Sequence, residues 1–280
     1  MNTIVQWTLL VIWCLSNGPA HAEGLPDILG IQLGMPAREA HAKLQAQLPK
    51  NKIQVMSEIL PTIDKPVIRS FLSAPAETIT TGMEADQVTL DVTLPPNKQS
   101  VWRVVRQHYF PNKGIARTTL VASLREKYGK ETLTNVAQGK PAQNDSQITS
   151  LLWFFDEQGQ PAPLPGLPGS KAPNLSTTLT LSSCMSGQES MQLNLIEVYA
   201  DLYKGQNPQN DWCNQSFTAV VVGLTESNLP ELISQMQIVS ISRPLALRAS
   251  EVSMKWKKEL AEGQHRQDLE KAKQQEKPKL

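Results

Sequence analysis

The sequence predicts an α+β fold in which helices pack on an antiparallel sheet. Two stretches, Ala37–Leu48 and Thr118–Tyr128, carry apolar residues at helical spacing, and Gly129 follows the second as a helix stop. A third stretch, Gln87–Leu94, alternates apolar residues with polar ones, which is the pattern of a strand with one buried and one wet face. Because antiparallel sheets tolerate a wet face, this alternation favours an antiparallel arrangement.

Other short runs rich in β-branched residues are separated by Pro, Gly and polar turns, and each predicts a strand. The stretch Pro161–Ser170 holds four prolines and two glycines, so we expect a linker or a long hairpin loop. Asn228–Gln237 is expected to be a short helical segment, with Asn228 as its N-cap and Pro230 early in the helix. The remaining predicted strands are Ile53–Leu60, Val67–Ala74, Val101–Tyr109, Glu131–Val136, Ile148–Phe155, Ser176–Ser183, Gln192–Tyr203 and Ser216–Leu224.

The chain divides into four expected segments. Residues 1–22 are a signal peptide, residues 23–113 a first α+β unit, residues 114–243 a second α+β unit, and residues 244–280 a charged helical tail. From Lys255 onward the tail holds eight Lys or Arg and five Asp or Glu, and this mixture of charges predicts a solvated helix. A basic tail that touches an anionic lipid or a wall polymer is the alternative interpretation.

The N-terminal segment has the pattern of a secretory signal. Ile4–Leu15 is mostly apolar and too short to span a bilayer, and Pro19–Ala22 supplies a cleavage site, so Glu23 is the expected mature N-terminus. Because Met1–Thr3 holds no Lys or Arg, a retained membrane anchor is the competing interpretation. With no later apolar run of transmembrane length, we expect no transmembrane segment after cleavage and a periplasmic or secreted protein.

Cysteine content and charge agree with export. Once Cys14 leaves with the signal, Cys184 and Cys213 remain, and two cysteines in an oxidising compartment predict one disulfide. A reactive thiol or a two-cysteine metal site is the alternative. The formal net charge of +1 gives no electrostatic basis for binding nucleic acid, so no nucleic-acid partner is expected.

The two predicted helices suggest an internal repeat. Gly34 precedes Leu44 by ten residues, and Gly114 precedes Leu124 by ten, while strand candidates follow each helix. Two tandem helix-plus-strands repeats are therefore a hypothesis. When the two segments are aligned with an offset of 80 residues, Ala42 also matches Ala122 and Leu48 corresponds to Tyr128.

The stretch "DILGIQLGMPARE" at Asp27–Glu39 resembles the opening segment of many uncharacterised exported bacterial proteins. With the later "LREKYGKETL" and "WFFDEQG", it also resembles, more distantly, the helix-plus-strands units of outer-membrane assembly lipoproteins of the SmpA type and of secreted β-lactamase inhibitor proteins. This resemblance implies binding to other proteins rather than catalysis. The sequence departs from the pattern at Pro36, where the pattern has Ser or Thr, and it lacks the lipid-anchor cysteine.

The opening stretch also has the look of a glycine-rich ligand loop. A phosphate loop needs hydroxyl or basic partners at a helix start, and this stretch supplies Leu, Met and Pro instead. We therefore expect Gly30 and Gly34 to permit turns or close packing. Pro36 suits the first helical position and Glu39 suits the positive end of the helix dipole.

No catalytic set can be named from the sequence. His41, His108 and His265 form no metal-binding spacing, and the chain contains no nucleophile elbow and no phosphate loop. The pair Asp156–Glu157 suits acid–base chemistry, but its place in a polar turn favours a structural role in a hairpin. We expect no catalytic residue, no metal ligand and no cofactor.

These observations favour a non-enzymatic protein-binding or cell-envelope accessory role, with another envelope or secreted protein as partner. Trp212, next to Cys213 in a polar stretch, is the first candidate for a partner contact. The alternative is a periplasmic hydrolase or small-ligand-binding protein whose site assembles from dispersed residues. A deep polar pocket containing His108 or an Asp/Glu pair with perturbed ionisation would favour that alternative.

Overall fold

The computed structural model describes residues 25–59, 66–77, 79–80, 83–135, 144–162, 218–229 and 231–274. The predicted signal peptide lies outside these residues, and so do Cys184, Cys213 and Trp212. Two predicted strands, Ser176–Ser183 and Gln192–Tyr203, also lie outside them.

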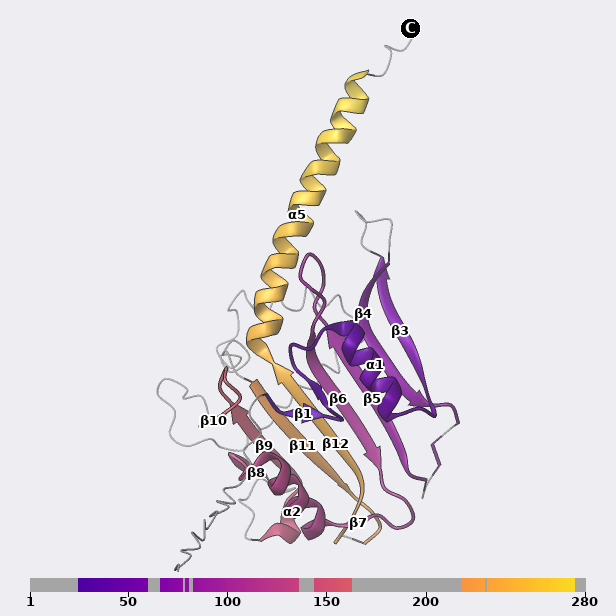
Figure 1. The fold of residues 1–280 in the computed structure, drawn as a ribbon, viewed down its shortest axis with the longest axis vertical. Helices are drawn as coiled ribbons and strands as arrows, with labels where there is room; N and C mark the ends of the chain where they lie inside the picture. The colour runs from indigo at the N-terminus through magenta and orange to yellow at the C-terminus, as the bar shows by residue number, and fades with distance from the viewer. Residues whose placement is uncertain are drawn as a thin grey trace, which may run out of the picture.

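One large antiparallel sheet forms the body of the molecule (Figure 1). Its order is β10-β9-β11-β12-β6-β5-β4-β3, with β7 pairing with β12 and β8 with β9. A separate hairpin joins β1 (Asp27–Ile28) and β2 (Ile31–Gln32). The strands of the large sheet are β3 (Asn51–Ile59), β4 (Pro66–Pro75), β5 (Ala85–Val92), β6 (Val101–Tyr109), β7 (Ile115–Ala116), β8 (Leu133–Asn135), β9 (Ser150–Phe155), β10 (Pro161–Ala162), β11 (Thr218–Glu226) and β12 (Leu232–Ser242).

Two helices, α1 (Ala37–Gln47) and α2 (Arg117–Tyr128), lie on the same face of this sheet (Figure 1). A short 3-10 turn, Asp145–Gln147, leads into β9, and the helix α5 (Arg243–Gln274) follows β12. The predicted α+β fold, with helices packed on an antiparallel sheet and a charged C-terminal helix, is confirmed.

Local sequence explains where α1 and α2 lie. Every third or fourth residue of α1 is buried (Ala37, Ala40, Leu44), so one stripe of the helix meets the sheet. The acidic Glu39 lies in the first turn of α1, as the sequence predicts, but Pro36 is the residue before the helix rather than its first position. At the end of α2, Gly129 adopts φ +80° as the C-terminal stop. The buried stripe of α2 consists of Arg117, Leu120, Val121, Leu124 and Tyr128.

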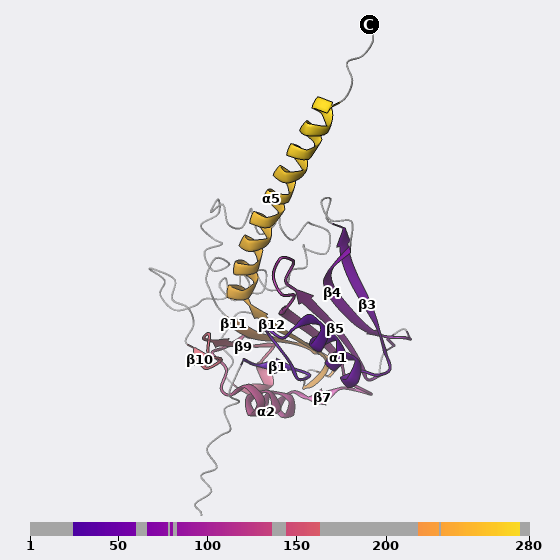
Figure 2. The same cartoon turned by 45° about the horizontal axis from the view of Figure 1, so that its top comes forward.

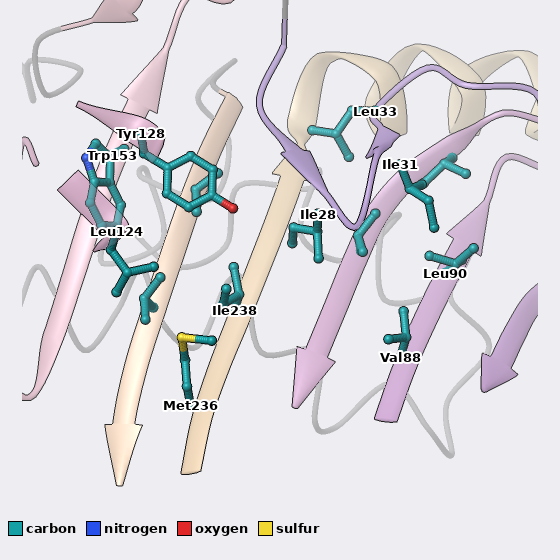
Figure 3. Packing of buried hydrophobic residues seen from close by; sticks show 14 of the residues in the cluster. Ile28, Ile31, Leu33, Val88, Leu90, Leu124, Tyr128, Trp153, Met236 and Ile238 are labelled. Carbon is teal, nitrogen blue, oxygen red and sulfur yellow. The ribbon is translucent and has the colours of Figure 1, made fainter. Parts of the chain in front are cut away.

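One hydrophobic core lies between the helices and the sheet (Figure 3). The β1–β2 hairpin is wedged over the middle of the sheet, where Ile28 and Ile31 are each 1% exposed. The turn of this hairpin holds Leu29 and Gly30 at positive φ, and the Gly30 N–H donates to the Asp27 carboxylate at 2.8 Å. The first glycine of the opening stretch therefore serves a turn, as predicted.

The two predicted units contribute to one continuous sheet, because β6 and β12 pair side by side. Their helix entrances are held in the same way. The Ala37 N–H donates to the Gln99 carbonyl at 2.9 Å, and the Arg117 N–H donates to the Glu231 carbonyl at 2.9 Å. In both units the accepting residue lies just before the strand that reaches the centre of the sheet. The internal duplication itself stays a hypothesis.

The prediction of a helical segment at Asn228–Gln237 is wrong. Residues from Leu232 onward form β12, which pairs with β11 on one side and with β6 on the other. From Ile238 onward β12 is buried on both faces, and its apolar residues do not alternate cleanly with polar ones. Asn228, the proposed N-cap, lies in the turn between β11 and β12 instead.

The first turns of the last helix are hydrogen-bonded to the loop between β5 and β6. The Asn97 side-chain amide donates to the Ala249 carbonyl at 3.0 Å, and the Ser253 hydroxyl donates to the Pro95 carbonyl at 2.8 Å. Beyond these contacts α5 extends far past the sheet (Figures 1 and 2). No helix of the described ranges is both long enough and apolar enough to cross a membrane.

Candidate protein-binding face

The two faces of the sheet differ in what covers them. In β5, Val88 and Leu90 are fully buried against α1 and the β1–β2 hairpin. Because side chains alternate along a strand, Gln87 and Thr89 point to the opposite face, and both are half-buried. We call this opposite side the helix-free face.

Over β3 to β6 the helix-free face is polar and accessible. The register of β5 with β6 places Thr89 opposite Val105 and Gln87 opposite Gln107, so these four side chains form one block. Each is half-buried, as expected for side chains on a sheet surface in contact with solvent. We call the following set the open patch: Gln54, Leu72, Gln87, Thr89, Arg103, Val105, Gln107 and Tyr109.

Close to α5, the same face of β9, β11 and β12 is apolar and buried, whereas Gln237 of β12, which pairs with Gln107, is exposed. Phe154 is 1% exposed, Ala219 0% and Ile241 2%. Ala246, in the first turns of α5, packs against them. This second core also includes Trp102 and Leu152.

A β-bulge marks the boundary between the open patch and the second core. Asp91 pairs with Arg103 and Val92 with Val101, so Trp102 is an extra residue in β6. The bulge lets Trp102 join the second core while Arg103 stays on the open patch. The Arg103 guanidinium lies 5.4 Å from the centre of the Trp102 ring and also donates to the Asp91 carboxylate.

A cavity of about 780 Å³ opens at one end of the sheet, where the β4–β5, β6–β7 and β11–β12 loops meet. Tyr109, the last residue of the open patch, lines it, so the cavity and the patch are continuous. Its other apolar lining residues are Ile79, Met83, Phe110 and Leu229, and its charged ones are Lys113 and Glu226.

His108 belongs to a charged cluster on the helix side of the sheet. The Arg106 Nε donates to one Asp86 carboxylate oxygen at 2.6 Å, and the His108 Nδ1 lies 3.1 Å from the same oxygen. Burial alone would raise the pKa of Asp86, but the hydrogen bonds from His108 and Arg106 together lower it below its ordinary value. A depressed carboxylate pKa favours a permanently charged ion pair rather than a proton-transfer group.

The other histidines are not brought near this cluster. The His41 ring packs on the Phe71 ring with 5.1 Å between ring centres, and His265 is exposed on α5. Within the described ranges, no group of three or more His, Cys, Asp or Glu residues is placed to hold a metal ion. The Asp156 carboxylate accepts from the Gln158 and Gln160 N–H groups, so this residue holds a hairpin turn, as the sequence predicts.

The sequence did not identify the open patch. In "RVVRQHY", Arg103–Tyr109, both alternating sets mix apolar and polar residues, so neither face could be assigned to the core. The partial signal was the clean alternation of Gln87–Leu94, whose polar residues Gln87 and Thr89 do lie on the helix-free face. The predicted contact residue Trp212 and the predicted disulfide lie outside the described residues.

No protein-family model, curated protein or solved structure matches this chain.

Proposed function

We propose that this protein is an exported, non-enzymatic binding protein that recognises another envelope or secreted protein through the open patch. The observation that carries the proposal is the contrast between the two sides of the sheet over β3 to β6. One side is a completed core, and the other presents a row of half-buried side chains on the same rigid strands.

A surface of this kind suits protein recognition. Sheets hold side chains at fixed spacing, so little conformational entropy is lost when a partner docks. Tyr109 and Arg103 belong to the residue types most often found at binding hot spots. The other polar members of the open patch, Gln54, Gln87, Thr89 and Gln107, are uncharged amides and a hydroxyl that can donate and accept hydrogen bonds.

The expected partner surface is polar with few net charges. Asp91 neutralises the one guanidinium of the open patch by a direct hydrogen bond. A partner therefore gains by matching hydrogen bonds and by covering Val105 and Leu72, not by charge attraction. Binding that depends little on salt concentration is the corresponding expectation.

Crosslinking in the native envelope followed by mass spectrometry tests this proposal. Thr89→Lys places a charge at the middle of the open patch and should remove the specific crosslinked partner. Ala42→Lys adds the same charge to an exposed position of α1 on the other side of the sheet, and it should leave the partner in place. Recovery of no specific partner by the wild-type chain, or equal recovery by Thr89→Lys, would contradict the proposal.

Export and internal duplication are part of the proposal. The signal-like N-terminus supports a periplasmic or secreted location. Intact-mass spectrometry that gives the mass of a chain starting at Glu23 would establish cleavage at the expected site. The matching hydrogen bonds at the two helix entrances support tandem repeats of a helix and four strands. An experimental structure in which α1 with β3–β6 fails to superpose on α2 with β8, β9, β11 and β12 would refute the duplication.

A second candidate function is binding of a small apolar ligand in the end cavity. The volume of about 780 Å³ and the aromatic lining from Tyr109 and Phe110 favour it, because ligand pockets commonly span about 300–1,000 Å³. Leu229→Asp should abolish binding of a fluorescent apolar probe to the native protein. Leu269→Asp is the matched control, since both leucines are about half exposed and Leu269 lies on α5. Equal probe binding by both variants would refute this candidate.

A further inference from the structure

The two edges of the large sheet are built differently. Beyond β9 the edge is made of β8, with three residues, and β10, with two residues that include Pro161. Very short strands and proline are devices that protect an edge against pairing with another chain. The opposite edge is β3, which has nine residues, holds no proline and pairs only with β4 within the described residues.

The β3 edge is also unusually apolar for an exposed strand. Val55 and Met56 are each 50% exposed, although they point to opposite faces of the sheet. The irregularity between β3 and β4 lies on the inner strand: Met56 pairs with Ser70 and Ser57 with Ile68, so the extra residue is Arg69 of β4. β3 itself stays regular, and no strand of the described residues pairs with its outer edge.

We propose that β3 pairs with β3 of a second copy of this chain, antiparallel and centred on Val55, so that two sheets join into one. The sequence of β3 is complementary to itself in this register. Val55 meets Val55 of the second copy, and Gln54 meets Met56. Lys52 lies opposite position 58, a glutamate, so the register pairs residues of opposite formal charge at both ends.

The backbone pattern permits this register. In an antiparallel strand, the N–H and C=O groups of every second residue point to the same edge. In every pair of this register the two residue numbers are both odd or both even. Residues whose backbone groups point to the outer edge of β3 are therefore paired with each other. The same parity places the helices of both copies on one side of the joined sheet. The open patches of both copies then lie together on the other side, and such a dimer presents two equivalent binding faces.

The contact is limited to one pair of strands, which is smaller than a standard interface of about 1,600 Å². We therefore expect a reversible dimer whose population rises with concentration. The main-chain hydrogen bonds supply the affinity, and the side-chain pairs around Val55 set the register.

Sedimentation velocity of the purified protein over a wide concentration range tests the proposal. The wild-type chain should change from monomer to dimer as its concentration rises. Val55→Lys should stay a monomer at concentrations about tenfold above those at which the wild type dimerises, since like charges directly opposed disfavour strand pairing. Val252→Lys is the matched control on α5, because Val252 is 45% exposed, and it should dimerise like the wild type. A wild-type chain that stays monomeric, or a Val55→Lys variant that dimerises equally, overturns the proposal.

The register has its own test. Residues directly opposed in antiparallel strands have Cα atoms about 4.5–5.5 Å apart, within the range that a disulfide spans. Val55→Cys should therefore form a disulfide-linked dimer on mild oxidation, above the background set by the cysteines of the wild-type chain. Met56 is equally exposed, but it lies opposite Gln54 of the second copy and two residues away from the second copy's Met56. Met56→Cys should therefore not form a disulfide-linked dimer. Equal crosslinking of the two variants contradicts the register centred on Val55.

Discussion

The helix-free face of the sheet differs between its two halves, although both halves carry a helix on the other side. Over β3 to β6 this face shows half-buried Gln, Thr and Arg side chains, whereas over β9, β11 and β12 it buries Phe154 and Ile241. Close to α5 the second half thus buries both faces of the sheet, and the first half keeps one face accessible. The same arrangement of helix and strands therefore leaves the helix-free face accessible in one half and covers it in the other.

The largest expected effect is in the second core. Phe154→Ala should lower the free energy of unfolding by about 3–5 kcal/mol, because it removes a fully buried ring. Val105→Ala, on the open patch, should cost only about 1 kcal/mol, because the valine is half-buried. Urea denaturation measures the free energy of unfolding of both variants. Equal losses of stability would show that the two halves do not differ in how much their helix-free faces contribute to stability.

The glycines that precede the two helices differ in the space around them. Gly114 has φ +102°, and a Cβ there would lie 2.3 Å from the Ile233 carbonyl oxygen, so Gly114→Ala should destabilise by about 2–4 kcal/mol. Gly34 has φ +86° but no atom near such a Cβ, so Gly34→Ala should cost about 1 kcal/mol. Thermal unfolding of the two variants compares them directly. A Gly34→Ala variant as unstable as Gly114→Ala would show that steric contact does not separate the two entrances.

Each half also holds a carboxylate whose pKa is lowered. Hydrogen bonds from Arg125 lower the pKa of Glu131, and those from His108 and Arg106 lower the pKa of Asp86 against the effect of burial. A carboxyl with a lower pKa in the folded state binds fewer protons there than in the unfolded chain. Its stabilisation is therefore complete above the unfolded pKa, near 4, and is lost as the pH falls through the folded pKa.

Glu131→Gln and Asp86→Asn should accordingly each lower stability at pH 7 and make stability less dependent on pH below about 4. Denaturation midpoints at several pH values measure this slope. A variant that keeps the wild-type slope would show that its carboxylate does not contribute to acid sensitivity.

The smallest expected effect concerns α5. The Arg248 guanidinium and the Glu157 carboxylate are 3.1 Å apart, but both side chains are mostly exposed. Arg248→Ala should therefore change stability by less than about 0.5 kcal/mol. Thermal unfolding at low and high salt measures it, and a clearly larger loss would mean that α5 depends on this ion pair rather than on its contacts with Asn97.

Helix positions could be predicted from the sequence because their signals are local. The spacing of Ala40 and Leu44 and the stop at Gly129 each lie within a few residues, and the structure places them as expected. The strand β12 was missed because Leu232, Met236 and Val239 also fit helical spacing, so its own pattern does not distinguish strand from helix.

The open patch could not be predicted, because it depends on which strands pair and in which register. The bulge at Trp102 moves one aromatic residue into the second core, and only the pairing of Asp91 with Arg103 reveals it. The same is true of β3, whose position at the edge follows from the strand order and not from its own residues.

Site-specific photo-crosslinking in the native host tests whether the open patch binds a protein partner. A photoreactive amino acid is placed at Gln107 on the open patch or at Gln45, which is exposed on α1 on the opposite side of the same half. We expect one discrete crosslinked protein partner from Gln107 and none from Gln45. The same adducts from both positions, or no partner from Gln107, would contradict this expectation.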